Sequence, residues 1–231
     1  KDIKVVQSGQ GADEVFGGYF WYPRMQAETG GDRLSRFRKH YFDRDHDEFL
    51  RMVSSQSRGS DYTGDYIAEQ LNAQGADEFM DAVLRLDATT LIVDDPVKRV
   101  DNMTMAWGLE ARVPFLDHHL VEFAAQCPAD IKLKSDGKYL LKAVARGIVP
   151  DAVIDRPKAA FPVPALKFVR GDFLNFMQDI LDSQACRERG LFDRLYVEQL
   201  LAAPELHHTR IQGSKLWQLT LLEYWLQRQV D

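Results

Sequence analysis

Near its amino end, the chain passes from a short apolar run directly into a glycine-rich turn and then into the start of a helix. The apolar run contains Ile3, Val5 and Val6, and the turn QSGQGADEVFGG follows at residues 7–18. An apolar run closed by Ser-Gly is typical of a strand buried in a parallel sheet. A parallel strand needs neighbours, and the chain opens on this strand without a Met. We therefore expect the sequence to be a piece of a longer protein.

The turn has the composition of a phosphate-binding loop but the wrong charges for one. The Gly-x-x-x-x-Gly-Lys-Ser/Thr spacing of a P-loop is absent, and Glu14 stands where a dinucleotide fingerprint would have its third glycine. Backbone amides at such a turn can still hold an anion at the start of a helix. Asp13 and Glu14 would repel phosphate unless a cation lay between them, and Mg²⁺ binds both carboxylates and phosphate oxygens.

A structural interpretation of the same turn is also open. Asp13 and Glu14 sit at a favourable place for acids if they only begin a helix. On spacing alone, this interpretation is the commoner one.

Composition excludes some classes of function. The 231 residues have a net charge of -6 and no evident basic face, so we expect no nucleic-acid partner. No apolar run reaches the length of a membrane span and no signal sequence opens the chain, so we expect a cytoplasmic protein without a membrane partner. Cys127 and Cys186 lack metal-ligand spacing and indicate reduced thiols, although sequence also allows a disulfide. No linker divides the chain convincingly.

Helices are expected over most of the remaining chain. Asp95 can cap a helix with Pro96 in its first position and Gly108 at its end, and Asp117 can cap the next. The segment LEARVPFLD at 109–117 is expected to run extended toward Pro114. The other expected helices are a short one in 12–25 that breaks at Gly17-Gly18 and stops near Pro23, two in 32–56, and one each in 61–73, 79–93, 118–127, 138–147 and 211–229.

A second stretch with possible chemistry is KRVDNMTMAWGLEARVPFLD at 98–117. Its apolar side chains, among them Met103, Met105 and Trp107, suggest that it packs inside the protein. Charges within such a segment must be paired or must face a site, and structural pairing is the commoner case. The charged residues are Lys98, Arg99, Asp101, Glu110, Arg112 and Asp117.

A third stretch, RPKAAFPVP at 156–164, holds Lys158 on a segment too rich in proline for a helix. A lysine fixed in this way can stabilise a developing negative charge. Without further information, an ordinary solvated lysine is the commoner interpretation. The histidines lack zinc-like partners, so we expect neither a histidine metal site nor a Ser-His-Asp triad.

Together these stretches resemble the synthetase domain of the asparagine synthetase family. SGQGADEVFGGY, RVDNMTMAWGLEARVPFLD, GKYLLKAV and RPKAAFPVP occur in the order that the family has, across most of residues 3–168. The match is looser beyond about residue 170. The resemblance implies an α/β ATP-pyrophosphatase fold, of which residues 1–231 would form the C-terminal portion, mostly helical with few parallel strands.

The resemblance also implies a two-step reaction. A carboxylate acceptor attacks the α-phosphate of ATP and forms an acyl-adenylate, and ammonia from an N-terminal glutaminase domain then displaces AMP to give an amide. ATP and Mg²⁺ are the implied cofactors, and a homodimer is an open expectation. The alternative is a scaffold of the same fold without activity.

Residue by residue, the resemblance assigns ATP binding to Ser8, Gly9 and Gly11, and Mg²⁺–pyrophosphate to Asp13 with Glu14 beside it. Lys158 matches a lysine that stabilises charge during adenylation and amide formation. The other candidates are Gln10, Asp101 and Arg112 as catalytic residues, and Asp95 and Arg99 at the acceptor pocket.

Two departures from the family pattern matter. Members that make asparagine have Glu at the position of Gln10, so the expected acceptor is either aspartate or a different carboxylate, N-acetylglutaminylglutamine. The segments around 7–25 and 93–125 look most like N-acetylglutaminylglutamine amidotransferases, a bacterial subfamily. The family's Ser-Gly-Gly-x-Asp-Ser pyrophosphate loop and its N-terminal cysteine nucleophile are absent from these residues. We therefore expect the isolated fragment to be inactive.

Overall fold

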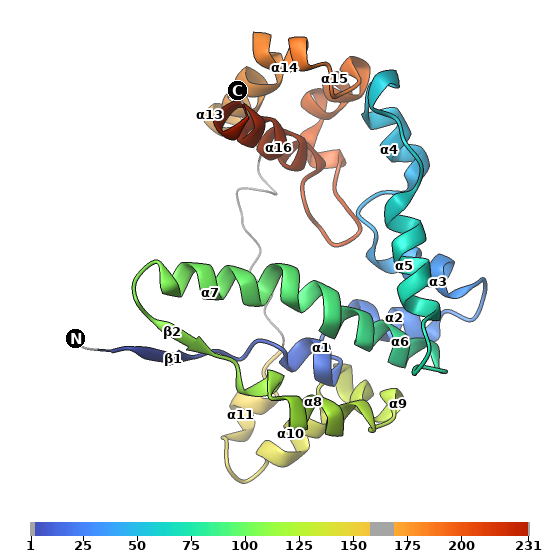
Figure 1. Ribbon diagram of the computed structural model, residues 1–231, viewed down its shortest axis with the longest axis vertical. Helices are drawn as coiled ribbons and strands as arrows, with labels where there is room; N and C mark the ends of the chain where they lie inside the picture. The colour runs from blue at the N-terminus through green and yellow to red at the C-terminus, as the bar shows by residue number, and fades with distance from the viewer. Residues whose placement is uncertain (1–2, 158–168, 231) are drawn as a thin grey trace. The chain divides into compact units, whose positions relative to one another are not determined.

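The computed structural model describes residues 3–157 and 169–230. The chain divides into two compact units, one formed by residues 1–37 and 64–157 and the other by residues 38–63 and 158–231. Figure 1 shows the elements in chain order. Among the described residues, no helix is long and apolar enough to span a membrane. Cys127 and Cys186 are both free thiols, as one of the two sequence interpretations expected.

The first unit contains a two-stranded parallel sheet. Strand β1 (Val5–Gln7) pairs with β2 (Glu110–Arg112), and Gln7 lies opposite Arg112. A parallel strand near the start and an extended segment around 110 were both predicted. The predicted burial was wrong, since Ile3 and Val5 are 58% and 41% exposed. No third strand lies beside this pair in the described part of the chain.

The helices of the first unit confirm the expected mostly helical fold with few parallel strands. Helix α1 packs Val15 and Phe16 against Ala124 of α8. The bounds are α1 (Ala12–Phe16), α2 (Trp21–Ala27), the first part of α3 (Arg33–Tyr41), most of α5 (Tyr62–Asn72), α6 (Phe79–Leu86), α7 (Lys98–Met105), α8 (His118–Ala125), α9 (Ala129–Lys132), α10 (Tyr139–Ala145) and α11 (Asp151–Ile154), with 3-10 turns at Pro114–Leu116 and Lys134–Asp136.

Helices α6 and α7 form one run that two π-helical segments join, η2 (Asp87–Leu91) and η3 (Val93–Val97). The predicted helix start at Asp95 and Pro96 is therefore wrong, because Pro96 lies inside the helical run. A π segment widens the turn and shifts the hydrogen bonds, which accommodates the missing N–H of proline. Such bulges occur often at functional sites.

Two more sequence expectations need correction. Pro23 does not stop a helix but lies in the first turn of α2, where a backbone N–H would have no partner in any case. Met103, Met105 and Trp107 are 67%, 54% and 84% exposed, so this segment does not pack inside the unit. By contrast, the predicted cap is confirmed, since the Asp117 carboxylate accepts from the backbone N–H of His119 at 3.0 Å.

The second unit is helical and has its own core. Met177, Leu181, Leu200 and Leu216 are buried together in that core. The two helices predicted in 32–56 are confirmed as α3 and α4. The elements are the end of α3, α4 (His46–Met52), the 3-10 turn Ser55–Ser57, the start of α5, α13 (Gly171–Asp182), α14 (Gln184–Arg189), α15 (Arg194–Ala202), the 3-10 turn Pro204–Leu206 and α16 (Lys215–Gln229).

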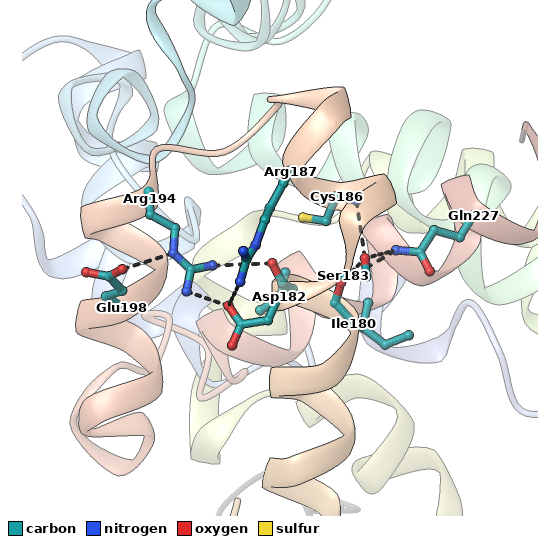
Figure 2. A network of polar contacts seen from close by, with 9 residues as sticks. Ile180, Asp182, Ser183, Cys186, Arg187, Arg194, Glu198 and Gln227 are labelled. Atoms are coloured by element: carbon teal, nitrogen blue, oxygen red, sulfur yellow. Dashed lines mark hydrogen bonds and ion pairs between the residues drawn. The ribbon is translucent and has the colours of Figure 1, made fainter.

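Charged and polar side chains tie the helices of this unit to one another (Figure 2). Arg194 at the start of α15 pairs with Asp182 at the end of α13, and its Nε lies 3.0 Å from Oε1 of Glu198. Gln227 of α16 donates from Nε2 to Oγ of Ser183 at 2.9 Å. These groups bind one another, so their positions are explained by the fold of the unit.

Candidate functional site

The glycine-rich turn connects the end of β1 to α1 within the first unit. Ser8 continues the strand, since its backbone N–H donates to the carbonyl of Arg112 at 2.9 Å. Arg112 therefore lies beside the turn, as the final residue of β2. The loop Ser8–Gly11 thus leaves the carboxyl end of a parallel strand pair, which is where α/β proteins commonly bind ligands.

Gly11 and Gly9 have different reasons to be glycine. Gly11 has a left-handed φ of 89°, and a Cβ there would lie 2.4 Å from Cδ2 of Leu116. Gly9 has a φ that any residue can adopt, and a Cβ there would meet no described heavy atom within 4 Å. Packing therefore requires glycine at position 11 but not at position 9. A ligand that approaches the backbone would give position 9 a reason to be glycine.

Gln10 joins this loop to the long helical run. Its Nε2 donates to the backbone carbonyl of Pro96 at 2.9 Å, and its Oε1 is buried without a partner among the described residues. The loop is therefore fixed to the π segment that also carries Asp95. A carboxylate at position 10 could not donate this hydrogen bond.

Asp13 lies at the exposed edge of α1 and faces a lysine that sequence reasoning did not identify. Oδ1 of Asp13 lies 3.0 Å from Nζ of Lys138, and both side chains are about 30% exposed (28% and 31%). A Cβ on Gly18 would lie 1.9 Å from Oδ1 of Asp13, so glycine at 18 leaves room for this carboxylate.

Lys138 is held in an unusual backbone conformation. Ser135, Asp136, Gly137 and Lys138 have successive φ values of 52°, 62°, 88° and 54°. Left-handed conformations cost energy in residues other than glycine, and they persist where the surroundings impose them, often at functional sites. Here the Lys138 backbone N–H donates to the carbonyl of Phe16 at 3.1 Å. The segment GKYLLKAV was recognised from sequence, but nothing in its pattern singled out this lysine.

Glu14, the neighbour of Asp13, points into the core. It is 2% exposed, and its Oε1 accepts from the hydroxyl of Tyr19 at 2.5 Å. Burial and the Glu14 carboxylate raise the pKa of Tyr19, so this hydroxyl stays protonated and able to donate. The structure thus separates the two acids that sequence reasoning had placed together.

A second buried acid lies close to Glu14. Asp87, at the start of η2, is 1% exposed and accepts from the hydroxyl of Tyr22 at 2.6 Å. Burial raises the pKa of Asp87 to about 7, with a smaller contribution in the same direction from the Glu14 charge. Sequence reasoning identified neither Asp87 nor its tyrosine partner, because both lie in segments that otherwise have the pattern of an ordinary helix.

The other predicted residues lie on exposed surfaces. Asp95 and Arg99 form an ion pair at 3.4 Å with more than half of each side chain exposed, so the pair contributes little to stability. Asp101 is exposed on α7 and Arg112 is exposed at the end of β2. Lys158 lies outside the described residues.

The described residues contain no group of three or more His, Cys, Asp or Glu side chains that could hold a metal ion. Mg²⁺ often binds through only one or two protein carboxylates, with phosphate and water as the other ligands. Asp13, which is partly exposed beside the loop, fits this kind of site. Glu14 does not, because Tyr19 occupies it inside the core.

Comparison with known proteins gives one consistent result. The model of a family described as asparagine synthase matches residues 1–227. The glutamine-hydrolysing asparagine synthetase 1 of Bacillus subtilis is 27% identical, over 97% of this chain and 40% of the relative. A putative asparagine synthetase of Mycobacterium tuberculosis is 31% identical, over 76% of this chain and 32% of the relative. The enzyme of Gallus gallus is 29% identical, over 58% and 25%. The chain spans two fifths or less of these relatives.

Proposed function

The chain belongs to the asparagine synthase family, and we propose that it forms part of a synthetase that makes an amide at the expense of ATP. In this proposal a carboxylate acceptor is activated as an acyl-adenylate, and ammonia released from glutamine by another domain of the parent protein attacks it. Adenylation makes the reaction possible because it converts a carboxylate oxygen into a good leaving group. The fold would be that of the ATP-pyrophosphatases.

The observation that carries the proposal is the Asp13–Lys138 pair beside the Ser8–Gly11 loop. The loop would bind phosphate through its backbone N–H groups, and Gly9 leaves space for close approach. Lys138 would leave Asp13 to contact a phosphate oxygen, which the partial exposure of both side chains allows. Mg²⁺ held by Asp13 would supply the positive charge that neutralises the developing pyrophosphate. The left-handed backbone at Lys138 would keep the ammonium group of this lysine close to the loop.

Lys158 and the exposed residues of η3, α7 and β2 would act on the acceptor side. From the family resemblance, we propose that Lys158 stabilises charge during adenylation and amide formation. Asp101 and Arg112 would contribute to the same step, and Asp95 and Arg99 would line the acceptor pocket.

Gln10 bears on the identity of the acceptor. The hydrogen bond from its amide to the Pro96 carbonyl requires a donor, and the glutamate of asparagine-forming members could not supply one in its ionised state. We therefore propose an acceptor other than aspartate, with an acylated dipeptide such as N-acetylglutaminylglutamine as the candidate.

The direct test is exchange of labelled pyrophosphate into ATP by the full-length protein, with Mg²⁺ present and the acceptor varied. We expect exchange that depends on N-acetylglutaminylglutamine and is weaker with aspartate. A Lys158→Ala variant that retains the unfolding transition of the wild type should lose the exchange. Absence of exchange with either acceptor would contradict the proposed ligase and would favour an inactive scaffold.

A second experiment concerns the chain by itself. Because the pyrophosphate loop of the family does not occur in residues 1–231, we expect no turnover of ATP and no tight binding by this segment alone. Calorimetry that showed tight ATP binding to residues 1–231 would contradict this part of the proposal.

A further inference from the structure

The core face of α1 borders a pocket that the proposed reaction does not use. The pocket has a volume of about 170 Å³ and lies within the first unit, between α1, α6, α8 and α9. Apolar side chains, among them Val15, Leu84 and Val121, form much of its wall. Four ionisable groups, Glu14, Asp81, Arg85 and Lys132, also line it.

Lys132 is buried in this wall with hydrogen-bonding capacity to spare. It is 2% exposed, and its Nζ donates to the carbonyl of Ala124 at 2.9 Å. An amine nitrogen of lysine has up to three N–H donors, and no ion pair to Lys132 within 4.0 Å occurs among the described residues. Burial lowers the pKa of Lys132, while the charge of Asp81 acts in the opposite direction.

Asp81 has an unused hydrogen-bond acceptor, whereas Lys132 has unused donors. Its Oδ1 is buried and has no hydrogen-bond partner among the described residues. Asp81 and Lys132 share one pocket and carry opposite charges, yet they do not contact each other directly. Buried polar atoms are nearly always satisfied, so a molecule in the pocket is expected to bridge an unpaired carboxylate oxygen and an amine with free donors.

The other charged groups at this pocket are already bound to the protein. Glu14 accepts from Tyr19. Arg85 donates to the backbone carbonyls of Gln70, Ala73 and Gln74 at 2.8, 3.1 and 2.7 Å. The recognition groups on which the proposal rests are the unpaired buried acceptor on Asp81 and the free donors on Lys132.

We propose that this pocket binds a small neutral molecule that carries a primary amide. The carbonyl of the amide accepts from Lys132, its NH₂ group donates to Asp81, and a short alkyl group packs on Val15, Leu84 and Val121. A neutral ligand suits the site because one acid and one amine already face each other across it. A cavity of about 150 Å³ can hold a ligand of six heavy atoms, whereas a water molecule occupies only about 30 Å³.

The test is a titration of the full-length protein with isobutyramide, followed by ligand-observed NMR. We expect saturable binding with a dissociation constant on the order of 1 mM, which is reasonable for six heavy atoms. Isobutyrate and isobutylammonium share the isopropyl group of isobutyramide but carry a charge, and they should bind at least tenfold more weakly.

Two variants assign the binding to this pocket. Lys132→Met keeps the length of the side chain and removes its donors, and Asp81→Leu removes the acceptor at a residue that is only partly buried. Each should weaken isobutyramide binding at least tenfold, with folding checked by thermal unfolding. If Lys132→Met fails to fold, Asp81→Leu still decides the question.

Three outcomes would overturn the proposal. The first is that isobutyramide shows no saturable binding, which would mean that the pocket holds only water. The second is that the folded variants bind isobutyramide as tightly as the wild type does. The third is that the charged analogues bind as tightly as isobutyramide. The titration contains neither ATP nor acceptor, so its result is independent of the proposed ligase activity.

Discussion

The two faces of helix α1 treat two neighbouring acids in opposite ways. On the loop face, Asp13 is partly exposed and meets Lys138 across 3.0 Å. On the core face, Glu14 is buried and meets the hydroxyl of Tyr19, next to a pocket and a second buried acid. The chemical groups are the same, and only their surroundings differ.

The difference in burial suggests that Asp13 serves binding or catalysis and that Glu14 serves the stability of the fold. A carboxylate that keeps contact with solvent can exchange its partner for a metal ion or a ligand at small cost. A buried carboxylate must keep its hydrogen bonds, because loss of a partner leaves an unsatisfied charge in the core. We therefore expect changes on the core face to alter folding, and changes on the loop face to alter activity.

The largest effect on folding is expected from Asp87 on the core side. Its pKa is raised from 3.8 to about 7, so between these pH values the folded state binds more protons at this group than the unfolded state does. This contribution to stability is full below pH 3.8, falls as the pH rises toward 7 and is constant above that. The slope is at most about 1.4 kcal/mol for each pH unit.

Urea denaturation from pH 4 to 8 would measure the Asp87 effect as the difference between the wild type and Asp87→Asn. The variant cannot titrate at this position, so subtraction removes the contributions of other groups. A difference that stays constant across the range would show that Asp87 does not titrate there.

The next effect in size is expected for Tyr19→Phe. The ring stays in place but Glu14 loses its donor, which should lower the free energy of unfolding by about 1–3 kcal/mol. Tyr62→Phe is a matched control, because Tyr62 is 75% exposed and its hydroxyl is expected to contribute almost nothing. Equal urea midpoints for the two variants would mean that the Tyr19–Glu14 bond does not stabilise the fold.

A more local contrast, of similar size, is expected between two alanine substitutions in the loop. Gly11→Ala places a Cβ against Leu116 at a left-handed φ, and should cost about 1–3 kcal/mol. Gly9→Ala meets open space and should leave the unfolding free energy within about 1 kcal/mol of the wild type. Both can be compared by urea denaturation. Similar losses of stability in the two variants would contradict the assignment of position 9 to a ligand.

The smallest effect on folding is expected for Asp13→Asn. Its ion pair with Lys138 is partly exposed, and such pairs contribute about 0–1 kcal/mol. Thermal unfolding should place this variant close to the wild type. A loss as large as that of Tyr19→Phe would remove the distinction between the two faces.

Much of the scaffold was predictable from local sequence signals. The apolar run and the Ser-Gly turn predicted β1 and the start of α1, and the Asp117 cap was correct because its hydrogen bonds involve only neighbouring residues. The predictions that a helix stops near Pro23 and that another begins at Pro96 were wrong. Both prolines lie inside helical turns that tolerate them, and tertiary packing decides whether such a turn forms.

The candidate site was predictable only in part. The loop and Asp13 were identified, but the sequence gives no sign that Glu14 turns inward, since both acids follow the same glycines. Lys138 lies 125 positions from Asp13 and meets it only through the left-handed turn at 135–138. Met103 and Trp107 were predicted to be buried but are exposed, because apolar character alone does not establish burial.

The central claim is that the loop face of α1 handles the nucleotide. The most direct measurement is pyrophosphate exchange by the full-length protein carrying Asp13→Asn, with its unfolding transition recorded in parallel. The account predicts a loss of exchange of about 100-fold or more with nearly unchanged stability. Exchange at the wild-type rate in this folded variant would contradict it.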